Sequence, residues 1–521
     1  MMSFIAPLIP VTQKASNVCA YCRVRKQRCD RTLPQCVRCA SKGRNCDYTP
    51  YKEPARHEIN DPEPLVDHKE GCTHADLSHR GATDVLQTLT ACINSPNSLE
   101  LVTRLSDTVY DILDLADINL PKALEEFGPC IQQWCPIIPE DILRGGLNDL
   151  SQDMRRTPGT GRSLLRLGLW LVSRQPCPHC GQVPQSGLYR TMKQIQALLQ
   201  CRSQLSLEAF QISMMIAVHE TGHGLQAQAF QTLSSGAALL RMLDLDARKS
   251  RAVSQIDPIE WMKVSMLMLD RMIPISMPVG SLPLIVSSVD SISKHVAQAV
   301  GPSIPPPSPR PYASSPRKVH IRAAVSLASG HVLEYIHAIH HKATPEETYD
   351  QVDEIINQCI KLLVDKPQPH TWLHCDAIAM AFCSHILLQA SQIRHIVNTA
   401  QGSYNFVSPA AEYTKAHLAL KYSRRMAWDM VHVAIEKIRS EAEIPHLPFA
   451  GLCCVFRAGL AVFETKEYVG EDVMGEQDIQ GFKKILEWFA ARWSIGEYFL
   501  ARLEELVRHN SQQHSCILLL C

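Results

Sequence analysis

The sequence predicts a mostly α-helical protein in which a small cysteine-rich module at the N-terminus precedes a large all-α domain. Six cysteines lie at regular intervals within residues 19–46. From about residue 81 onward, apolar residues recur at intervals of three and four, whereas alternating strand-like runs are scarce. Because 521 residues are too many for one ordinary core, we expect the two parts to fold as separate units.

The composition indicates in which cellular compartment the protein is found. The first residues contain a short apolar run without a basic segment ahead of it, and no run of about 18 apolar residues occurs. The chain has 20 cysteines and no secretory signal, which indicates free thiols and metal ligands rather than disulfides. We therefore expect a soluble, non-secreted protein with no membrane partner.

The net charge of zero averages two regions of opposite charge. Between the first and sixth cysteine the only acid is Asp30, and the basic residues are Arg23, Arg25, Lys26, Arg28, Arg31, Arg38, Lys42 and Arg44. A basic cluster of this density indicates a polyanionic partner. The acidic and proline-containing residues that follow indicate a linker over 51–80, and residues 1–14 are predicted to be disordered.

The cysteines of the predicted module, residues 15–50, have the spacing of a metal site. They follow the pattern C-x2-C-x6-C-x6-C-x2-C-x6-C and are Cys19, Cys22, Cys29, Cys36, Cys39 and Cys46. Zinc prefers four thiolates, so six cysteines either fill one site and leave two unused, or fill two sites by sharing two sulfurs. Because so short a segment cannot bury enough apolar surface, we expect metal binding to supply its folding free energy.

This module resembles the fungal zinc binuclear cluster (Zn2Cys6) family of transcription factors. The six cysteines, the basic run between the second and third of them, and Pro34 in the connecting loop carry the resemblance. It implies two Zn2+ ions per chain, with Cys19 and Cys36 as the shared ligands. Cys22 and Cys29 would complete one site, and Cys39 and Cys46 the other.

The resemblance also implies binding to double-stranded DNA. Lys26, three residues before the third cysteine, matches the family's reader of a CGG triplet, and Arg25 matches the adjacent basic position. We expect a short helix after each C-x2-C pair, the first carrying this basic run into the major groove. The predicted phosphate contacts are Arg23, Arg28, Arg38, Lys42 and Arg44.

The implied function is that of a nuclear, sequence-specific regulator of RNA polymerase II genes, acting on a metabolic or secondary-metabolite gene cluster. Its further partners would be the transcription machinery or co-regulators and a second copy of the chain, although no sustained heptad repeat follows Cys46. The alternative is a metal-stabilised interaction module that does not bind DNA.

The region 81–521 is predicted to be an all-α regulatory domain. Its most regular helical patterns cover residues 98–116, 347–365, 415–441 and 482–510. The proline-rich stretch 301–318 is predicted to be a disordered loop, since its proline density excludes helix and sheet. Residues 187–200, 217–246 and 261–275 loosely resemble the middle homology domain of the same family, which supports a regulatory role.

A second zinc-like pattern, HETGH, raises an alternative function. His219, Glu220 and His223 have the H-E-x-x-H spacing of zinc-dependent hydrolases. The third ligand of one such class is missing, because Gln226 and Ala229 occupy its glycine and histidine positions. A distant acid such as Glu260 leaves the alternative open, but we favour a helix end followed by a glycine turn, and we predict no enzyme activity.

The remaining cysteines and the methionines have simpler interpretations. The CPHC sequence at 177–180 has no second pair of cysteines nearby and is predicted to be a loop with incidental thiols. Cys453 and Cys454 are predicted to be small buried residues, and Met262, Met266 and Met268 are predicted to fill the core.

Overall fold

The structure, a computed structural model, describes most of the chain in two compact units, residues Met1–Gly71 and Cys72–Cys521. The described residues are 14–15, 17–24, 28–44, 46, 48, 76–96, 98–138, 160–175, 186–201, 206–250, 258–278, 280–300, 316–364, 374–401, 410–470 and 474–518.

The first unit contains two short helices, α1 (Ala20–Val24) and α2 (Val37–Ala40). Its described part has one isolated antiparallel bridge, between Lys14 and Thr32. The centre of the unit consists of cysteines rather than aliphatic side chains, and the four that are fully buried are Cys19, Cys22, Cys36 and Cys39. Such a core buries too little apolar surface to hold the chain by itself.

The expected position of the two helices was wrong by a few residues. Each helix begins immediately after the first cysteine of a C-x2-C pair and contains the second, instead of following the pair. In α2 the reason is visible: the Cys36 sulfur accepts a hydrogen bond from the Cys39 amide at 3.4 Å, so Cys36 is the N-cap.

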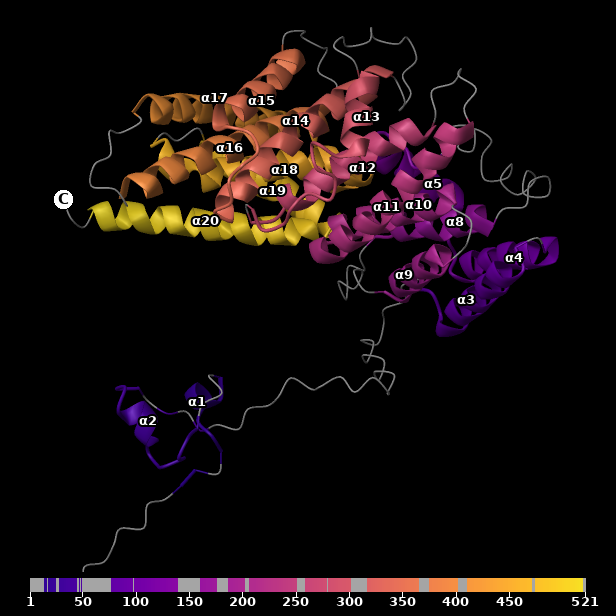
Figure 1. The fold of residues 1–521 in the computed structure, drawn as a ribbon, viewed down its shortest axis with the longest axis horizontal. Coiled ribbons are helices and arrows are strands. Elements are labelled where there is room, and N and C mark those ends of the chain that lie inside the picture. The colour runs from indigo at the N-terminus through magenta and orange to yellow at the C-terminus, as the bar shows by residue number, and fades with distance from the viewer. Residues whose placement is uncertain are drawn as a thin grey trace, which may run out of the picture. The chain divides into compact units, whose positions relative to one another are not determined.

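The second unit is built from helices, as predicted (Figure 1). Its helices are α3 (His79–Asn94), α4 (Leu99–Leu115), α5 (Leu120–Phe127), η1 (Gly128–Gln132), α8 (Thr160–Ser173), α9 (Gly187–Gln200), α10 (Leu207–Gly222), α11 (Gln226–Ser250), α12 (Pro258–Ile275), α13 (Ser291–Val300), α14 (Pro316–His340), α15 (Tyr349–Val364), α16 (Cys375–Gln401), α17 (Ala410–Lys437), η3 (Glu441–His446), α18 (Phe449–Glu464), η4 (Lys466–Tyr468), α19 (Glu476–Arg492) and α20 (Ile495–Leu518).

Two groups of helices share one continuous core. Helix α10 packs against α8, α9 and α11, and α16 packs against α14, α15, α17 and α18. Helix α12 contacts members of both groups. Residues 209–222 of α10 and 449–463 of α18 are all buried, as expected for helices that are apolar around most of their circumference. Cys453, Cys454 and the three methionines singled out in α12, Met262, Met266 and Met268, are buried in this core, as predicted.

Buried arginines join the helices through carbonyl groups. Arg271 donates from Nε to the Ser326 carbonyl at 3.0 Å and from Nη1 to the Val286 carbonyl at 2.8 Å. Arg492 similarly donates to the Val172 carbonyl at 2.9 Å, near the end of α8. Because an unpaired buried carbonyl is costly, these side chains fix how the helix ends meet.

Two predicted boundaries need correction. Helix α14 begins at Pro316, inside the predicted loop 301–318, because proline at the first position of a helix removes only an amide that has no partner there. Helix α3 begins at His79, inside the predicted linker 51–80, and the Ser78 hydroxyl caps it by accepting from the Gly81 amide at 3.1 Å. Residues 1–13, 51–75 and 301–315 lie outside the described part.

The last predicted helical stretch, residues 482–510, is interrupted. Helix α19 ends at Arg492 and α20 begins at Ile495. Trp493 between them is extended, with φ −129° and ψ 108°, and its ring lies 4.5 Å from that of Phe449, centroid to centroid. Burial of this indole therefore accounts for the break.

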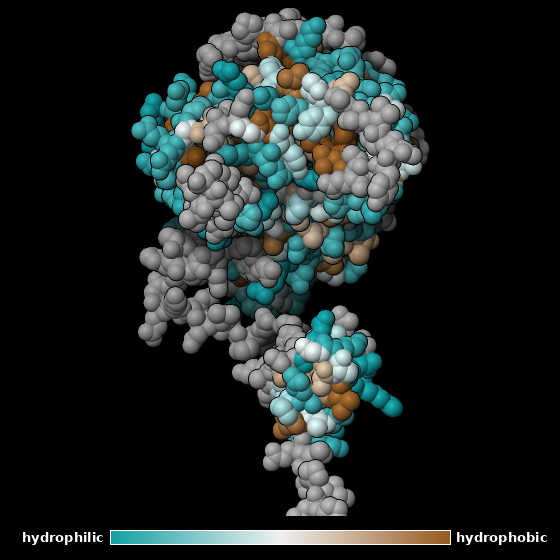
Figure 2. Space-filling view, turned by 90° about the vertical axis from the view of Figure 1, so that its left-hand side faces the viewer, coloured by the Kyte–Doolittle hydropathy of each residue, from teal (hydrophilic) through white to brown (hydrophobic). Residues whose placement is uncertain are grey.

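The surface of the molecule is polar over the face drawn in Figure 2, where hydrophobic residues form small patches. None of the helices in the described part of the chain combines the length and the apolar character that crossing a membrane requires.

Candidate metal centre

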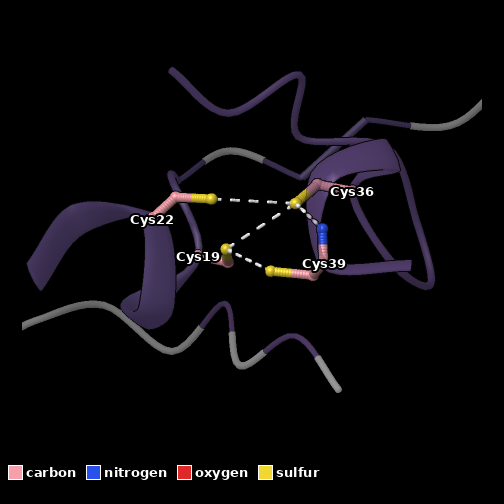
Figure 3. Close-up of side chains that lie close together, drawn as sticks. All are labelled: Cys19, Cys22, Cys36 and Cys39. Carbon is pink, nitrogen blue, oxygen red and sulfur yellow. Dashed lines mark hydrogen bonds between the residues drawn. The ribbon is translucent and has the colours of Figure 1, made fainter. Parts of the chain in front are cut away.

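The fold of the first unit brings all six predicted cysteines together. Figure 3 shows four of them, Cys19 and Cys22 from the α1 side and Cys36 and Cys39 from the α2 side, with their sulfurs turned toward one another. Cys29 and Cys46 reach the same cluster from the segments that follow each helix, with their sulfurs 3.8 Å from Cys19 and 3.6 Å from Cys36, respectively.

Cys19 and Cys36 hold the central positions of this cluster. Their sulfurs lie 3.9 Å apart, and each also lies within 4 Å of two further sulfurs. Cys19 contacts Cys29 and Cys39, both at 3.8 Å. Cys36 contacts Cys22 at 3.9 Å and Cys46 at 3.6 Å. The contacts therefore place the sulfurs of Cys19 and Cys36 between those of the other four cysteines.

The sulfur spacing fits tetrahedral zinc. With a zinc–sulfur bond of about 2.3 Å, neighbouring sulfurs of a ZnS4 tetrahedron lie about 3.8 Å apart, and the contacts here measure 3.6–3.9 Å. A disulfide would require about 2.05 Å, and all six thiols are free. The residues present thus fit a thiolate-bound metal cluster.

The electrostatics of the thiols point the same way. Burial raises the pKa of Cys19 to about 12 and raises that of Cys36 as well. Burial also opposes ionisation of Cys46, but hydrogen bonds, first of all from the Cys36 amide, lower its pKa to about 7. Burial thus disfavours an isolated thiolate at Cys19 and Cys36, and a bound cation would offset this penalty.

Residues other than cysteines close the loops around the cluster. Asp30 accepts from the Val37 amide, the first of α2, at 3.1 Å. The Tyr48 hydroxyl donates to the Thr32 carbonyl at 2.7 Å, which ties the chain after the last cysteine to the loop between the two halves. The Arg44 guanidinium lies 4.7 Å from the Tyr21 ring centroid. Sequence reasoning missed these roles because the signal lies in contacts between residues distant in sequence.

Four of the seven predicted DNA-contacting side chains are exposed around the cluster, and they are Arg28, Arg38, Lys42 and Arg44. Arg23 lies in α1, but its side chain is outside the described part, as are Arg25 and Lys26 altogether. The exposed cations face solvent, where a polyanion can reach them.

The HETGH sequence lies in the second unit and forms a helix end, as predicted. Helix α10 ends at Gly222, and Gly224 adopts φ 74°, the left-handed conformation that ends a helix with little strain for glycine. The Leu225 amide donates to the Glu220 carbonyl at 2.8 Å, which completes the turn before α11.

The side chains of this sequence are buried in packing contacts. The Glu220 carboxylate is fully buried and accepts from the Tyr189 hydroxyl at 2.7 Å and from Lys193 Nζ at 3.0 Å. The His219 ring stacks on Tyr189, with centroids 5.4 Å apart, and lies 4.4 Å from the His223 ring. His223 Nδ1 lies 3.1 Å from the Ser494 hydroxyl. The motif thus joins the end of α10 to α9 and to the junction of α19 and α20.

Within the described part of the chain, two groups of three or more metal-ligating side chains have ligand atoms within 4.8 Å of one another, and both groups lie in the first unit. The two groups are Cys19 with Cys22, Cys36 and Cys39, and Cys29 with Asp30 and Cys36. The CPHC sequence at 177–180 lies outside the described residues.

Comparison with known families gives a match in the first unit. Residues 17–54 match the fungal Zn(2)-Cys(6) binuclear cluster domain. Comparison with curated proteins and with solved structures gives no significant match. Since the family match ends at residue 54, the resemblance of the helical segments to a middle homology domain stays a prediction. The N-terminal module is therefore a fungal Zn(2)-Cys(6) binuclear cluster domain, the DNA-binding module of a class of fungal transcription regulators, and its cysteine cluster binds two zinc ions.

Proposed function

We propose that this protein is a nuclear, sequence-specific regulator of RNA polymerase II transcription and not an enzyme. The observation that carries the proposal is the six-cysteine cluster of residues 17–54, surrounded by exposed basic side chains. The metal holds the fold of the cluster, and the cations meet the phosphate backbone of duplex DNA.

Within the cluster, Cys19 and Cys36 would be the ligands that the two zinc ions share. Cys22 and Cys29 would complete one site, and Cys39 and Cys46 the other. The sulfur contacts support Cys19 and Cys36 as the shared ligands, because each lies within 4 Å of the other and of two outer sulfurs. The division of the four outer cysteines between the two sites is supported by the family resemblance. The zinc ions neutralise thiolate charge, while this chain's loops orient the basic residues.

Lys26, with Arg25 beside it, contacts the bases of a CGG-type triplet in the major groove and so recognises the DNA sequence. The family resemblance supports this role, and hydrogen bonds to guanine acceptors are the chemistry of such a contact. Arg23, Arg28, Arg38, Lys42 and Arg44 contact phosphates, which adds affinity and salt dependence but little choice of sequence.

The helical unit regulates the DNA-bound protein or recruits the transcription machinery and co-regulators. We further propose a homodimer, which would place two cluster domains on paired triplets. The target genes would belong to a metabolic or secondary-metabolite gene cluster. Both follow from the family resemblance alone.

The test compares binding of the zinc-loaded full-length protein to a CGG-bearing duplex and to a scrambled duplex by fluorescence anisotropy at several salt concentrations. We expect tighter binding to the CGG duplex. Lys26→Ala should lose about 1–3 kcal/mol of that preference. The matched control Lys42→Ala should weaken binding to both duplexes equally, and it should reduce the slope of log affinity against log salt concentration by about 1.

Equal affinity for both duplexes at every salt concentration would contradict sequence-specific binding. Absence of binding to either duplex would favour the alternative of an interaction module that does not bind DNA. Retained discrimination in Lys26→Ala would remove Lys26 as the reader while leaving the DNA-binding function in place.

A further inference from the structure

Three histidines gather at the C-terminal end of α14, in the second unit, far in sequence from the cysteine cluster. They are His337, His340 and His341. The backbone remains helical through His341, whose amide donates to the His337 carbonyl at 3.1 Å. Lys342, with φ 56°, then ends the helix. His337 and His341 are consequently one turn apart on the same side of the helix.

The rings of the three histidines lie close together. The centroids of His337 and His341 lie 4.4 Å apart, and that of His340 lies 5.0 Å from His341. Two imidazoles at positions i and i+4 of a helix are a common arrangement for binding one ion, because one turn separates them by about the span of two metal–nitrogen bonds of about 2.1 Å.

A backbone carbonyl orients one of the two rings. His341 Nε2 lies 3.1 Å from the carbonyl oxygen of Gly280, in the segment between α12 and α13. A carbonyl only accepts, so Nε2 carries the proton and Nδ1 keeps its lone pair. Histidines that bind metals usually donate their other ring N–H to such an acceptor, which fixes the ring and its tautomer.

The segment around Gly280 fits closely against the histidines. Gly280 has φ 75°, and a Cβ atom at this position would lie 2.7 Å from Cβ of His340. The glycine therefore lets the backbone approach the end of α14 and bring its carbonyl within reach of His341.

The end of α14 offers a cation both favourable and unfavourable charges. The last carbonyls of α14 add negative partial charge at this end of the helix, whereas the ammonium of Lys342 opposes it. His340 and His341 are exposed, so an ion can enter from solvent.

We propose that His337 and His341 bind one divalent transition-metal ion of the zinc, nickel and copper class, with water completing its coordination and His340 beside it. Imidazole suits these ions. This site is chemically distinct from the thiolate cluster, and it would link the end of α14 to the segment that contains Gly280.

The test uses the zinc-loaded full-length protein freed of excess zinc, with Ni2+ as the probe. Calorimetric titration should show that the wild type binds one more Ni2+ per chain than the double variant His337→Asn/His341→Asn. The affinity of this site for Ni2+ should fall at least about tenfold in the variant. The matched control is His395→Asn/His446→Asn, which removes two exposed histidines from α16 and η3 and should bind Ni2+ like the wild type.

Thermal unfolding gives a second readout, because an ion that binds only the folded chain raises the melting temperature. Ni2+ should raise it in the wild type and in the control but not in the double variant. If the double variant fails to fold, the exposed single variant His341→Asn takes its place. Equal Ni2+ binding by variant and wild type, or nickel uptake matched by zinc release in both, would overturn the proposal.

Discussion

The sulfur of Cys19 lies 3.9 Å from the sulfur of Cys36, and 17 positions in sequence separate the two residues. They are the first cysteines of the two halves of the module, and each lies next to the start of a helix. Cys19 also contacts the sulfurs of Cys29 and Cys39, and Cys36 also contacts those of Cys22 and Cys46. A change at either position therefore affects both halves, whereas a change at an outer cysteine affects one.

Cys19→Ser should lower the zinc content of the full-length protein more than Cys29→Ser does. Loss of a shared thiolate weakens both tetrahedra, so we expect Cys19→Ser to lose both zinc ions. Cys29→Ser removes a ligand from one tetrahedron only, and more than half of the zinc should remain. Zinc per chain is measured by atomic absorption after gel filtration. Equal zinc loss in the two variants would contradict the shared positions of Cys19 and Cys36.

Asp353 should make the helical unit sensitive to acid. Burial opposes ionisation of this carboxylate, but hydrogen bonds from His385 and from Lys415 Nζ, at 2.9 Å, outweigh it and lower the pKa to about 2. A folded pKa below the unfolded value of about 3.9 stabilises the fold above that value, and the contribution is lost as pH falls from about 4 to about 2. Its full size is on the order of 2–3 kcal/mol.

The measurement for Asp353 is the melting temperature of the helical unit at pH 7 and pH 3, in the wild type and in Asp353→Asn. The variant should melt at a lower temperature at pH 7, and the difference between the two proteins should shrink at pH 3. The control Lys483→Met removes the exposed Lys483–Glu504 ion pair, 2.8 Å long, and should change melting little at either pH. A constant difference across pH would contradict the assigned ionisation.

Gly222→Ala should destabilise the junction between α10 and the end of α19. A Cβ atom at this position would lie 2.2 Å from the buried Trp493 ring, so we expect a loss of about 1–3 kcal/mol. Gly236→Ala in α11 is the control, because its nearest neighbour would be at 3.6 Å and the change should be neutral or stabilising. Thermal melting compares the two, and equal melting temperatures would contradict the tight contact with Trp493.

The sequence alone was sufficient to predict the cysteine cluster and the helical class of the second unit. Zinc ligands have fixed spacing, and helices that pack on a core carry their apolar residues at helical intervals, so both leave local patterns. Cys19 to Cys46 and the helical pattern over residues 98–116, which forms α4, are examples in which the pattern and the structure agree.

Features that depend on contacts between distant residues left no such pattern. The Tyr48 hydroxyl reaches the Thr32 carbonyl, and Arg492 reaches the Val172 carbonyl of α8, across separations that no local signal encodes. The break at Trp493 was missed for the same reason, since the helical period continues through it and burial of the indole decides the backbone. The start of α14 was missed because proline is read as a helix breaker, although it is tolerated at the first helical position.

His219→Asn should leave the zinc content of the full-length protein unchanged while lowering its melting temperature. A hydrolase would need His219 and His223 as ligands and Glu220 as a base beside a metal-bound water. Here the Glu220 carboxylate is fully buried and accepts from Tyr189 and Lys193, and the His219 ring packs between Tyr189 and His223. Loss of one zinc ion in the variant, together with loss of a metal-dependent hydrolytic activity, would instead support the hydrolase. Retention of two zinc ions with reduced stability would establish the motif as a packed helix end.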